Sequence, residues 1–250
     1  MADSLVIIPT YNEKGNIVRV IDAIFSLSQA FHILIVDDGS PDGTAELVQQ
    51  QKERYPGRLF LIERAGKLGL GTAYITGFKW GLQRGYDYLF EMDADFSHNP
   101  RYIPAMIELS KQKHVVIGSR YVPGGGQRNC TWKRVLLSKG GNFVARSLLG
   151  LKAQDATAGF RLYRREVLES IPLNRVFSSG YSFLVEMLFL CQRRGWQIGE
   201  VPITFEDRRK GQTKISRQEV LKAQYTLLRL AFRRLRGGEP RRPEVPVSSS

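Results

Sequence analysis

Short apolar runs alternate with segments of helical spacing through the first half of the chain. Runs with the length and composition of buried strands occupy Leu5–Pro9, Ile33–Asp37, Leu59–Glu63, Tyr88–Asp93 and Val115–Ser119. Apolar residues recur every three or four positions, as in helices, over Asn16–Ala30, Thr44–Tyr55, Thr72–Arg84 and Ile103–Lys113. This alternation predicts an α/β fold with a mostly parallel, doubly wound sheet. Because ligands of such sheets bind beyond the carboxyl ends of the strands, a functional site is expected there.

Two later helical patterns combine basic and apolar residues, over Trp132–Leu151 and Gln218–Arg236. Basic amphipathic helices adsorb to anionic lipid headgroups, and the segment near 216–236 is the better candidate for a membrane-surface helix. Packing against the domain core is the alternative for both. Residues 237–250 have almost no apolar content, so we expect a disordered tail after a single domain over 1–236.

The composition fits one domain in a reducing compartment. A chain of 250 residues with 42% hydrophobic content can bury one sizeable core. Two cysteines, Cys130 and Cys191, provide neither a disulfide framework nor a metal quartet. The sequence reaches its first strand at Leu5 without the pattern of a signal peptide. It also contains no apolar run near the roughly 20 residues that span a bilayer, so we expect a soluble or peripheral protein.

The net charge of +13 predicts an anionic partner. Residues 201–250 contain twelve Lys and Arg against five Asp and Glu, so much of the excess is at this end. Nucleic acid, lipid headgroups and a phosphorylated substrate all fit. A nucleic-acid-binding module is the weakest of these, because the charge lies in a tail and an amphipathic helix rather than in a recognition motif with interleaved aromatic residues.

Two carboxylates end the fourth apolar run, in the sequence Met92-Asp-Ala-Asp95. On an extended backbone, side chains two apart share a face about 7 Å from each other, so Asp93 and Asp95 can serve one divalent cation. A hard cation held there would face phosphate. The alternative for an isolated Asp-x-Asp is a charged turn that closes a strand.

Three other segments place polar chemistry at strand ends. Pro9–Glu13 offers a ring and a carboxylate, or else a helix cap at Thr10 or Asn12. Val36–Gly43 offers carboxylates suited to ribose hydroxyls and glycines that admit a ligand, although an Asx-rich turn would look similar. Lys67–Gly71 is a plausible phosphate neighbourhood without the spacing of a dinucleotide fingerprint or a P-loop. All converge on one edge of the predicted sheet.

The motifs in this order resemble the inverting family 2 glycosyltransferases. They are Pro9–Glu13, Asp37–Gly43, Leu68–Tyr74, Met92–Asp95 and Gly118–Tyr121. Three further runs are similar to the dolichol-phosphate mannose synthases, also called polyprenol-phosphate mannosyltransferases: Gly159–Arg164, Ile198–Pro202 and Phe205–Lys214. The resemblance covers roughly residues 5–235 and implies a GT-A fold that transfers mannose from GDP-mannose to dolichyl or polyprenyl phosphate. Another donor such as UDP-glucose is the alternative.

The resemblance also implies roles for individual residues. The guanosine part of the donor would be held by Pro9, Tyr11, Glu13, Val36 and Asp38. Asp93 and Asp95 would hold Mg²⁺ or Mn²⁺ on the diphosphate, with the Ala94 backbone against the donor. Ser97 falls where some relatives carry a Gln ligand, and a hydroxyl is the poorer ligand. His98 is interpreted as a turn residue, because the chemistry does not need its proton.

Basic residues are expected where the diphosphate of the donor and the phosphate of the lipid acceptor meet. Arg134 and Ser138 lie four apart in a helical pattern and could grip a lipid phosphate together with Arg120, which also neighbours the donor. A solvated basic face is the alternative. By resemblance, a loop with Arg208 and Lys214 closes over the donor, and its cations counter the diphosphate charge.

Asp155 and Glu186 are inner carboxylates without an assigned role. The lipid acceptor implies a peripheral protein at the cytoplasmic face of a membrane, the endoplasmic reticulum in a eukaryote or the plasma membrane in a prokaryote. It would bind the membrane surface directly or through a small membrane-anchoring subunit, and no nucleic acid.

Overall fold

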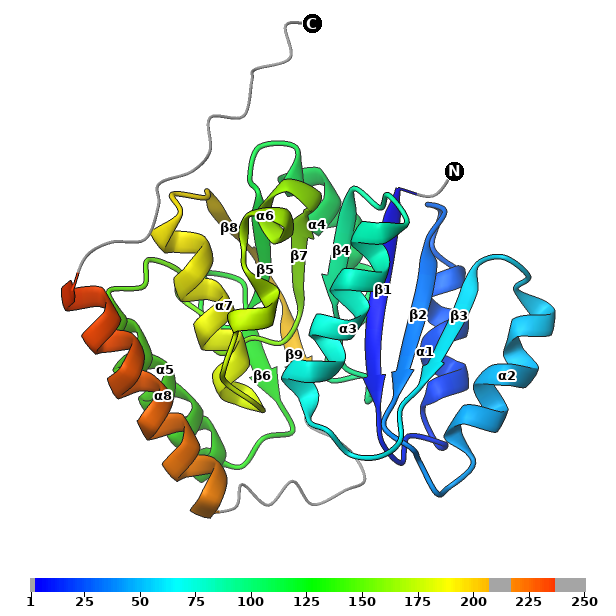
Figure 1. Ribbon diagram of the computed structural model, residues 1–250, viewed down its shortest axis with the longest axis horizontal. Helices are drawn as coiled ribbons and strands as arrows, with labels where there is room; N and C mark the ends of the chain where they lie inside the picture. Colours follow the sequence, from blue (N-terminus) through cyan, green and yellow to red (C-terminus); the bar gives the residue numbers. More distant parts are fainter. Residues whose placement is uncertain (1–2, 207–216, 237–250) are drawn as a thin grey trace, which may run out of the picture.

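The computed structural model describes residues 3–206 and 217–236, and Figure 1 shows a twisted sheet with helices on both faces. Within these residues the main sheet has seven strands in the order β3-β2-β1-β4-β7-β5-β8. Its strands are β1 (Ser4–Thr10), β2 (His32–Asp37), β3 (Leu59–Glu63), β4 (Tyr88–Glu91), β5 (Val115–Ser119), β7 (Arg161–Arg164) and β8 (Ile198–Pro202). A separate pair consists of β6 (Gly126–Arg128) and β9 (Thr204–Glu206).

All neighbouring strands of the main sheet are parallel except at β7, which runs antiparallel to both β4 and β5. The mostly parallel sheet is therefore confirmed. The antiparallel insertion was not predicted, since periodicity reports burial but not strand direction. Because β4 and β5 flank β7, they point the same way, and the carboxyl ends of β1, β2, β4, β5 and β8 share one edge.

The two faces of β1 explain why the helices cover both sides. Alternate residues of a strand point to opposite faces. Leu5 and Ile7 belong to one core cluster and Val6 and Ile8 to the other, and all four are fully buried. The first cluster takes residues from α3 (Leu70–Gln83), α6 (Arg165–Ser170) and α7 (Tyr181–Arg193). The second takes them from α1 (Ile17–Phe25), α2 (Thr44–Arg54) and α4 (Ile103–Ser110).

The five predicted strands and four predicted helices are all present; Leu59–Glu63 and Val115–Ser119 match at both ends, and the others differ at one end or both. The first helix stops at Phe25 rather than Ala30, and the Ser26 hydroxyl donates to the Ala23 carbonyl at 2.8 Å just beyond it. The fourth strand ends at Glu91, so Asp93 lies after the strand rather than in it. Short 3-10 helices occupy Pro100–Tyr102 and Leu173–Arg175.

The two basic amphipathic segments form helices that lie side by side, α5 (Trp132–Leu149) and α8 (Arg217–Arg236) (Figure 1). Thr131 caps the start of α5, and Gly150 ends it with a left-handed φ of 65°. Leu230 of α8 is fully buried in the first core cluster, and Arg234 donates to the Leu148 carbonyl at 2.9 Å. Both helices thus pack through one face, as in the alternative interpretation, and leave the other face open.

Candidate active site

The strand ends expected to carry function do meet along one edge, the lower edge of the sheet in Figure 1. Tyr11 and Glu13 follow β1, Asp38 follows β2, and the Asp93–Asp95 turn follows β4. Arg120 follows β5 on the other side of the antiparallel strand β7. The edge therefore has a side formed by β1, β2 and β4 and a side formed by β5.

The β2 end holds two aspartates with different partners. Asp37 accepts from the Thr10 hydroxyl at 2.7 Å and from the Ser40 amide at 2.8 Å, which ties the ends of β1 and β2 together. Asp38 is buried and accepts from Arg64 Nε at 2.6 Å. Asp38 is thus one half of a buried ion pair at the position where the sequence predicts a contact with the nucleoside.

The other nucleoside-side candidates lie around this ion pair. Val36 is fully buried on β2 and Pro9 is half-buried on β1. Tyr11 is exposed, with the Lys67 ammonium 4.5 Å from its ring centroid, so the Lys67–Gly71 segment does reach the first strand exit. Glu13 accepts from the Asn16 side chain at 2.9 Å at the start of α1. A ring, a cation and a carboxylate therefore border one open surface.

The acidic turn after β4 is built from local hydrogen bonds and one left-handed residue. Asp95 Oδ1 accepts from the Ser97 amide at 2.9 Å, and Phe96 between them has φ 60°. Asp93 Oδ1 lies 3.5 Å from the Tyr74 hydroxyl, and Oδ2 lies 3.6 Å from His98 Nδ1. The Asp93 side chain is 32% exposed, so one carboxylate of the pair faces outward at the edge of the sheet.

The donor atoms of this turn fit a hard divalent cation. Among the described residues, no cluster of three or more His, Cys, Asp or Glu side chains is placed to hold a metal. Two carboxylates suit Mg²⁺ or Mn²⁺ only when substrate phosphates and waters complete the coordination, which is how Mg²⁺ is commonly bound. Ser97 Oγ is buried without a hydrogen-bond partner in the described chain. This turn therefore also contains a hydroxyl oxygen that could serve as a metal ligand.

His98 is in a turn, as predicted, but its ring is buried. It stacks on Phe160 at 5.4 Å between ring centroids and meets the edge of Phe205 at 5.7 Å. A Cβ added at Gly159 would lie 3.4 Å from this ring and 3.7 Å from Asp93 Oδ2. His98 therefore fills the space behind the acidic turn and supports Asp93 from the interior.

A buried Glu and Arg under the turn were not singled out from the sequence. Glu91 is fully buried on β4 and accepts from the Tyr163 hydroxyl at 3.4 Å, and burial raises the pKa of Glu91 to about 8. Arg161 is fully buried on β7 and donates to three carbonyl oxygens, of Ala156, Ala158 and Leu184, at 2.6 to 2.9 Å. Charged residues inside apolar strands were the available signal, since such groups are rarely buried without partners.

On the β5 side, the dominant contact is an ion pair between Arg120 and Asp155. Arg120 Nε and Nη2 each donate to one Asp155 carboxylate oxygen at 2.7 Å, and the Arg120 amide donates to the same carboxylate at 3.0 Å. The Arg120 side chain is only 11% exposed and Asp155 is fully buried. Burial alone would raise the pKa of Asp155, but the hydrogen bonds and charge of Arg120 hold it below its usual value.

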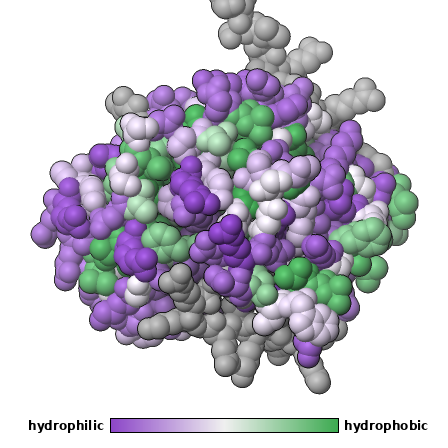
Figure 2. Space-filling model, turned by 180° about the vertical axis from the view of Figure 1, so that it is seen from behind, coloured by the Kyte–Doolittle hydropathy of each residue, from purple (hydrophilic) through white to green (hydrophobic). Residues whose placement is uncertain are grey.

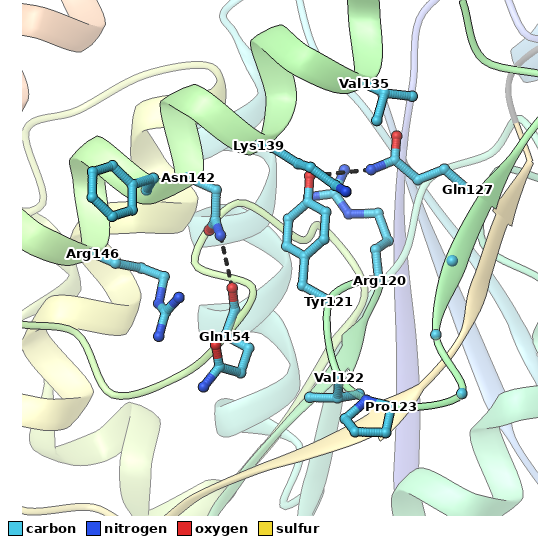
Figure 3. Close-up of a pocket in the computed structure, with 14 residues that line it drawn as sticks. Arg120, Tyr121, Val122, Pro123, Gln127, Val135, Lys139, Asn142, Arg146 and Gln154 are labelled. Carbon is cyan, nitrogen blue, oxygen red and sulfur yellow. Dashed lines mark hydrogen bonds between the residues drawn. The ribbon is translucent and has the colours of Figure 1, made fainter. Parts of the chain in front are cut away.

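A pocket of about 680 Å³ opens beside Arg120, between α5 and the segment that follows β5. Figure 3 shows Lys139, Asn142 and Arg146 on the side of α5 that faces Tyr121 and Gln154. The Tyr121 hydroxyl lies 2.7 Å from Ser138 Oγ and accepts from Gln127 at 3.1 Å.

The structure places most of the acceptor-side candidates together. Ser138 contacts Tyr121, the neighbour of Arg120, and Arg134 lies one turn before Ser138 on α5. Arg208 and Lys214 lie outside the described residues. Lys139 and Arg146 were not singled out from the sequence, where they looked like part of a basic face.

Comparisons with known proteins place the chain among glycosyltransferases. The model of glycosyl transferase family 2 matches residues 5–171. The polyprenol monophosphomannose synthase of Mycolicibacterium smegmatis is 44% identical over 231 residues, which cover 92% of this chain and 87% of the relative. The undecaprenyl-phosphate mannosyltransferase of Micrococcus luteus is 44% identical over 212 residues, which cover 85% of this chain and 87% of the relative.

Solved structures confirm the predicted GT-A fold. The crystal structure of glucosyl-3-phosphoglycerate synthase from Mycobacterium tuberculosis, in complex with Mn²⁺, UDP-glucose and phosphoglyceric acid, superimposes with a TM-score of 0.67 at 20% identity. The similarity covers 92% of this chain and 79% of that chain. At this level of identity the likeness establishes the fold.

The Arg120–Asp155 pair predicts a specific dependence of stability on substitution and pH. Asp155→Asn should lower the free energy of unfolding at pH 7 by about 3 to 5 kcal/mol, because it leaves Arg120 buried without a counter-charge. The folded pKa of Asp155 lies below its ordinary value of 3.8. The ion pair therefore stabilises the fold above that value, and its contribution is lost as pH falls through the folded pKa.

Urea unfolding from pH 7 down to pH 2 measures this effect. Glu166→Gln is the matched control, since Glu166 pairs with Arg164 at 3.5 Å on the surface and its loss should cost less than about 1 kcal/mol. Equal losses in the two variants, or a difference from wild type that grows toward low pH, would contradict a stabilising role for the buried pair.

Proposed function

Because this chain belongs to glycosyltransferase family 2, we propose that it transfers mannose from GDP-mannose to dolichyl or polyprenyl phosphate with inversion of the anomeric carbon. The observation that carries this proposal is the similarity to polyprenol monophosphomannose synthase over 92% of the chain. That span is longer than the part matched by the family model, residues 5–171, which already contains β5, α5 and the pocket.

In this proposal the β1, β2 and β4 side of the edge binds the donor. Pro9, Tyr11 and Glu13 contact the guanosine together with Val36 and Asp38. The exposed Tyr11 ring offers a stacking surface, and Asp38 acts through its pair with Arg64, which fixes the end of β2. Preformed contacts of this kind lower the cost of ordering a ligand.

Asp93, Asp95 and Ser97 hold Mg²⁺ or Mn²⁺ in this proposal, with the Ala94 backbone against the donor. A bound divalent cation would offset the negative charge of the departing nucleoside diphosphate. Tyr74 and His98 keep the Asp93 carboxylate in place from behind. Arg208 and Lys214 lie outside the described residues. In this proposal they add positive charge next to the same diphosphate, and Arg208 is a catalytic residue.

The reaction needs no strong general base, since the nucleophile is an acceptor phosphate that is already anionic at neutral pH. A phosphate oxygen forms the new bond to the anomeric carbon while the bond to GDP breaks, so an α-linked donor gives a β-linked mannosyl phosphate. Arg120, Arg134 and Ser138 hold the acceptor phosphate, with Arg120 fixed by Asp155. Catalysis then rests on positioning and on neutralising charge.

The exposed faces of α5 and α8 support binding to a membrane surface. Among the described residues, twelve large hydrophobic side chains are exposed, and ten of them lie on these two helices. They are Trp132, Leu136, Leu137, Phe143, Val144, Leu148, Tyr225, Leu228, Phe232 and Leu235. In the reverse view of Figure 2 apolar side chains gather at the lower right, on the side of α5 and α8. In the described part of the chain, no helix is long and apolar enough to cross a membrane.

We therefore propose that α5 and α8 rest on an anionic lipid surface at the cytoplasmic face of the membrane, alone or beside a small membrane subunit. The α5 sequence contains four Lys and Arg and no Asp or Glu. Such a combination of apolar area and positive charge is typical of interfacial helices. Binding of α5 and α8 to the membrane would bring the pocket beside α5 to the depth of the phosphate headgroup of the acceptor lipid.

A donor panel tests the proposed reaction. The purified protein is incubated with labelled GDP-mannose or UDP-glucose, polyprenyl phosphate, and Mg²⁺ or Mn²⁺, with chelator in parallel samples. We expect label in the organic phase from GDP-mannose only, and its loss with chelator. Transfer from UDP-glucose but not from GDP-mannose would overturn the donor assignment, and no lipid product with any donor would refute the function.

The acidic turn can be tested without disturbing its geometry. Asn in place of Asp95 can still accept from the Ser97 amide, so Asp95→Asn removes charge but keeps the turn. We expect kcat to fall about a hundredfold or more, the size of effect seen when one transition-state contact is removed. The variant should also bind Mn²⁺ more weakly in an electron paramagnetic resonance titration.

The control for that variant is Asp87→Asn, an exposed residue at the opposite end of β4. Wild-type activity and Mn²⁺ affinity in Asp95→Asn would remove the metal role from the turn.

Membrane binding is tested by sedimentation with phosphatidylglycerol vesicles. Leu228→Ser combined with Leu235→Ser should weaken binding by about a hundredfold or more, because each Leu buried in lipid contributes roughly 1.5 to 3 kcal/mol. Leu68→Ser is the control, since Leu68 is an exposed Leu far along the chain from both helices. Equal vesicle binding in wild type and the double variant would show that α8 does not meet the membrane.

A further inference from the structure

The pocket beside α5 has a strongly positive lining. Arg120, Lys139 and Arg146 line it, and none of its described lining residues is Asp or Glu. Arg120 is neutralised by Asp155. Neither Lys139 nor Arg146 forms an ion pair with a carboxylate of the described chain. Two cations in one pocket thus keep their charge for a ligand.

Arg146 has a donor that the protein itself does not use. Its Nε is buried and has no hydrogen-bond partner among the described residues. A buried donor left unpaired costs about 1 to 3 kcal/mol, so its place here is better explained by an acceptor that arrives with a ligand. The neighbouring Asn142 is already engaged, with the Gln154 carbonyl at 2.7 Å and the Ala156 amide at 2.8 Å.

Lys139 and Arg146 can act on the same group. They are two helical turns apart on α5, which is about 10 Å along the axis, and Figure 3 shows both on the side that faces Tyr121 and Gln154. Both side chains are long and line the same pocket, so their charged ends can turn toward one phosphate bound in it.

The rim of the pocket is apolar on the side of α5. Phe143 lines the pocket yet is 67% exposed, and Val144 and Leu148 continue the exposed apolar surface along the helix. A ligand that fits both parts has an anionic head and an apolar chain. Free phosphate would use only the cations.

A series of side-chain contacts connects the pocket with the acidic turn. The Arg120 guanidinium is 5.5 Å from the Phe205 ring centroid, Phe205 is 5.7 Å from the His98 ring, and His98 Nδ1 is 3.6 Å from Asp93. The pocket is therefore on the side of the fold that also carries the proposed site of the donor diphosphate.

We propose that Lys139 and Arg146 hold the phosphate of the lipid acceptor, and that Phe143 contacts the first part of its apolar chain. This inference rests on the proposed function and extends the acceptor site from Arg120, Arg134 and Ser138 along α5. The two cations bind the substrate and let its phosphate approach a second anion.

Titration calorimetry with farnesyl phosphate, farnesol and inorganic phosphate tests this site. Wild type should bind farnesyl phosphate more tightly than either other probe. Lys139→Gln and Arg146→Gln should each weaken farnesyl phosphate binding about tenfold, the loss of one charge-assisted contact. The control is Lys133→Gln, which removes one charge from the same helix outside the pocket and should bind like wild type.

Steady-state kinetics separate this site from the overall function. Both variants should raise KM for polyprenyl phosphate about tenfold and leave KM for GDP-mannose unchanged. Unchanged farnesyl phosphate affinity in both variants, or inorganic phosphate binding as tight as farnesyl phosphate, overturns the inference. Variant-sensitive farnesyl phosphate binding in a wild type that transfers no mannose supports the lipid-phosphate site and refutes the proposed reaction.

Discussion

The buried ion pair between Arg120 and Asp155 is the contact on which the β5 side of the site depends. It joins the end of β5 to a loop that comes 35 residues later in the chain. Glu200 on β8 accepts from the backbone amides of Gln154 and Asp155, and Asn142 on α5 holds the amide of Ala156. Strand, loop and helix thus share one network, and such networks fix geometry only when their members are satisfied.

The antiparallel strand β7 separates two groups of charged residues at the edge of the sheet. Carboxylates of Asp93 and Asp95 face one side, and the cations of α5 face the other. The proposed transfer joins two phosphorylated substrates, and separate binding sites fit it, because like charges brought together without compensation repel strongly. Apolar core clusters pack on both faces of β1, behind the edge of the sheet. They hold the β1, β2 and β4 side and the β5 side of that edge in place.

The repeating part of the fold was predictable from local pattern, whereas the site was predictable only in part. Strand and helix periodicity identified β1 to β5 and α1 to α4, but β7 is a four-residue run with an Arg at each end, too short and too polar to stand out as a strand. Asp93 stood out because its neighbours in sequence are apolar. Asp155 had no assigned role, since its partner Arg120 is distant in the chain. Lys139 and Arg146 were interpreted only as basic residues of an amphipathic helix, because the pocket that they line is formed by segments distant in sequence.

We propose that donor diphosphate and lipid phosphate meet at one edge of the sheet, on opposite sides of β7. A crystal structure of the protein with Mn²⁺, GDP and farnesyl phosphate measures this directly, with the anomalous signal of manganese locating the metal. We expect manganese at Asp93 and Asp95 in contact with the diphosphate, and the farnesyl phosphate head in the pocket beside Arg120. Manganese elsewhere, or a farnesyl phosphate bound away from α5, would contradict it.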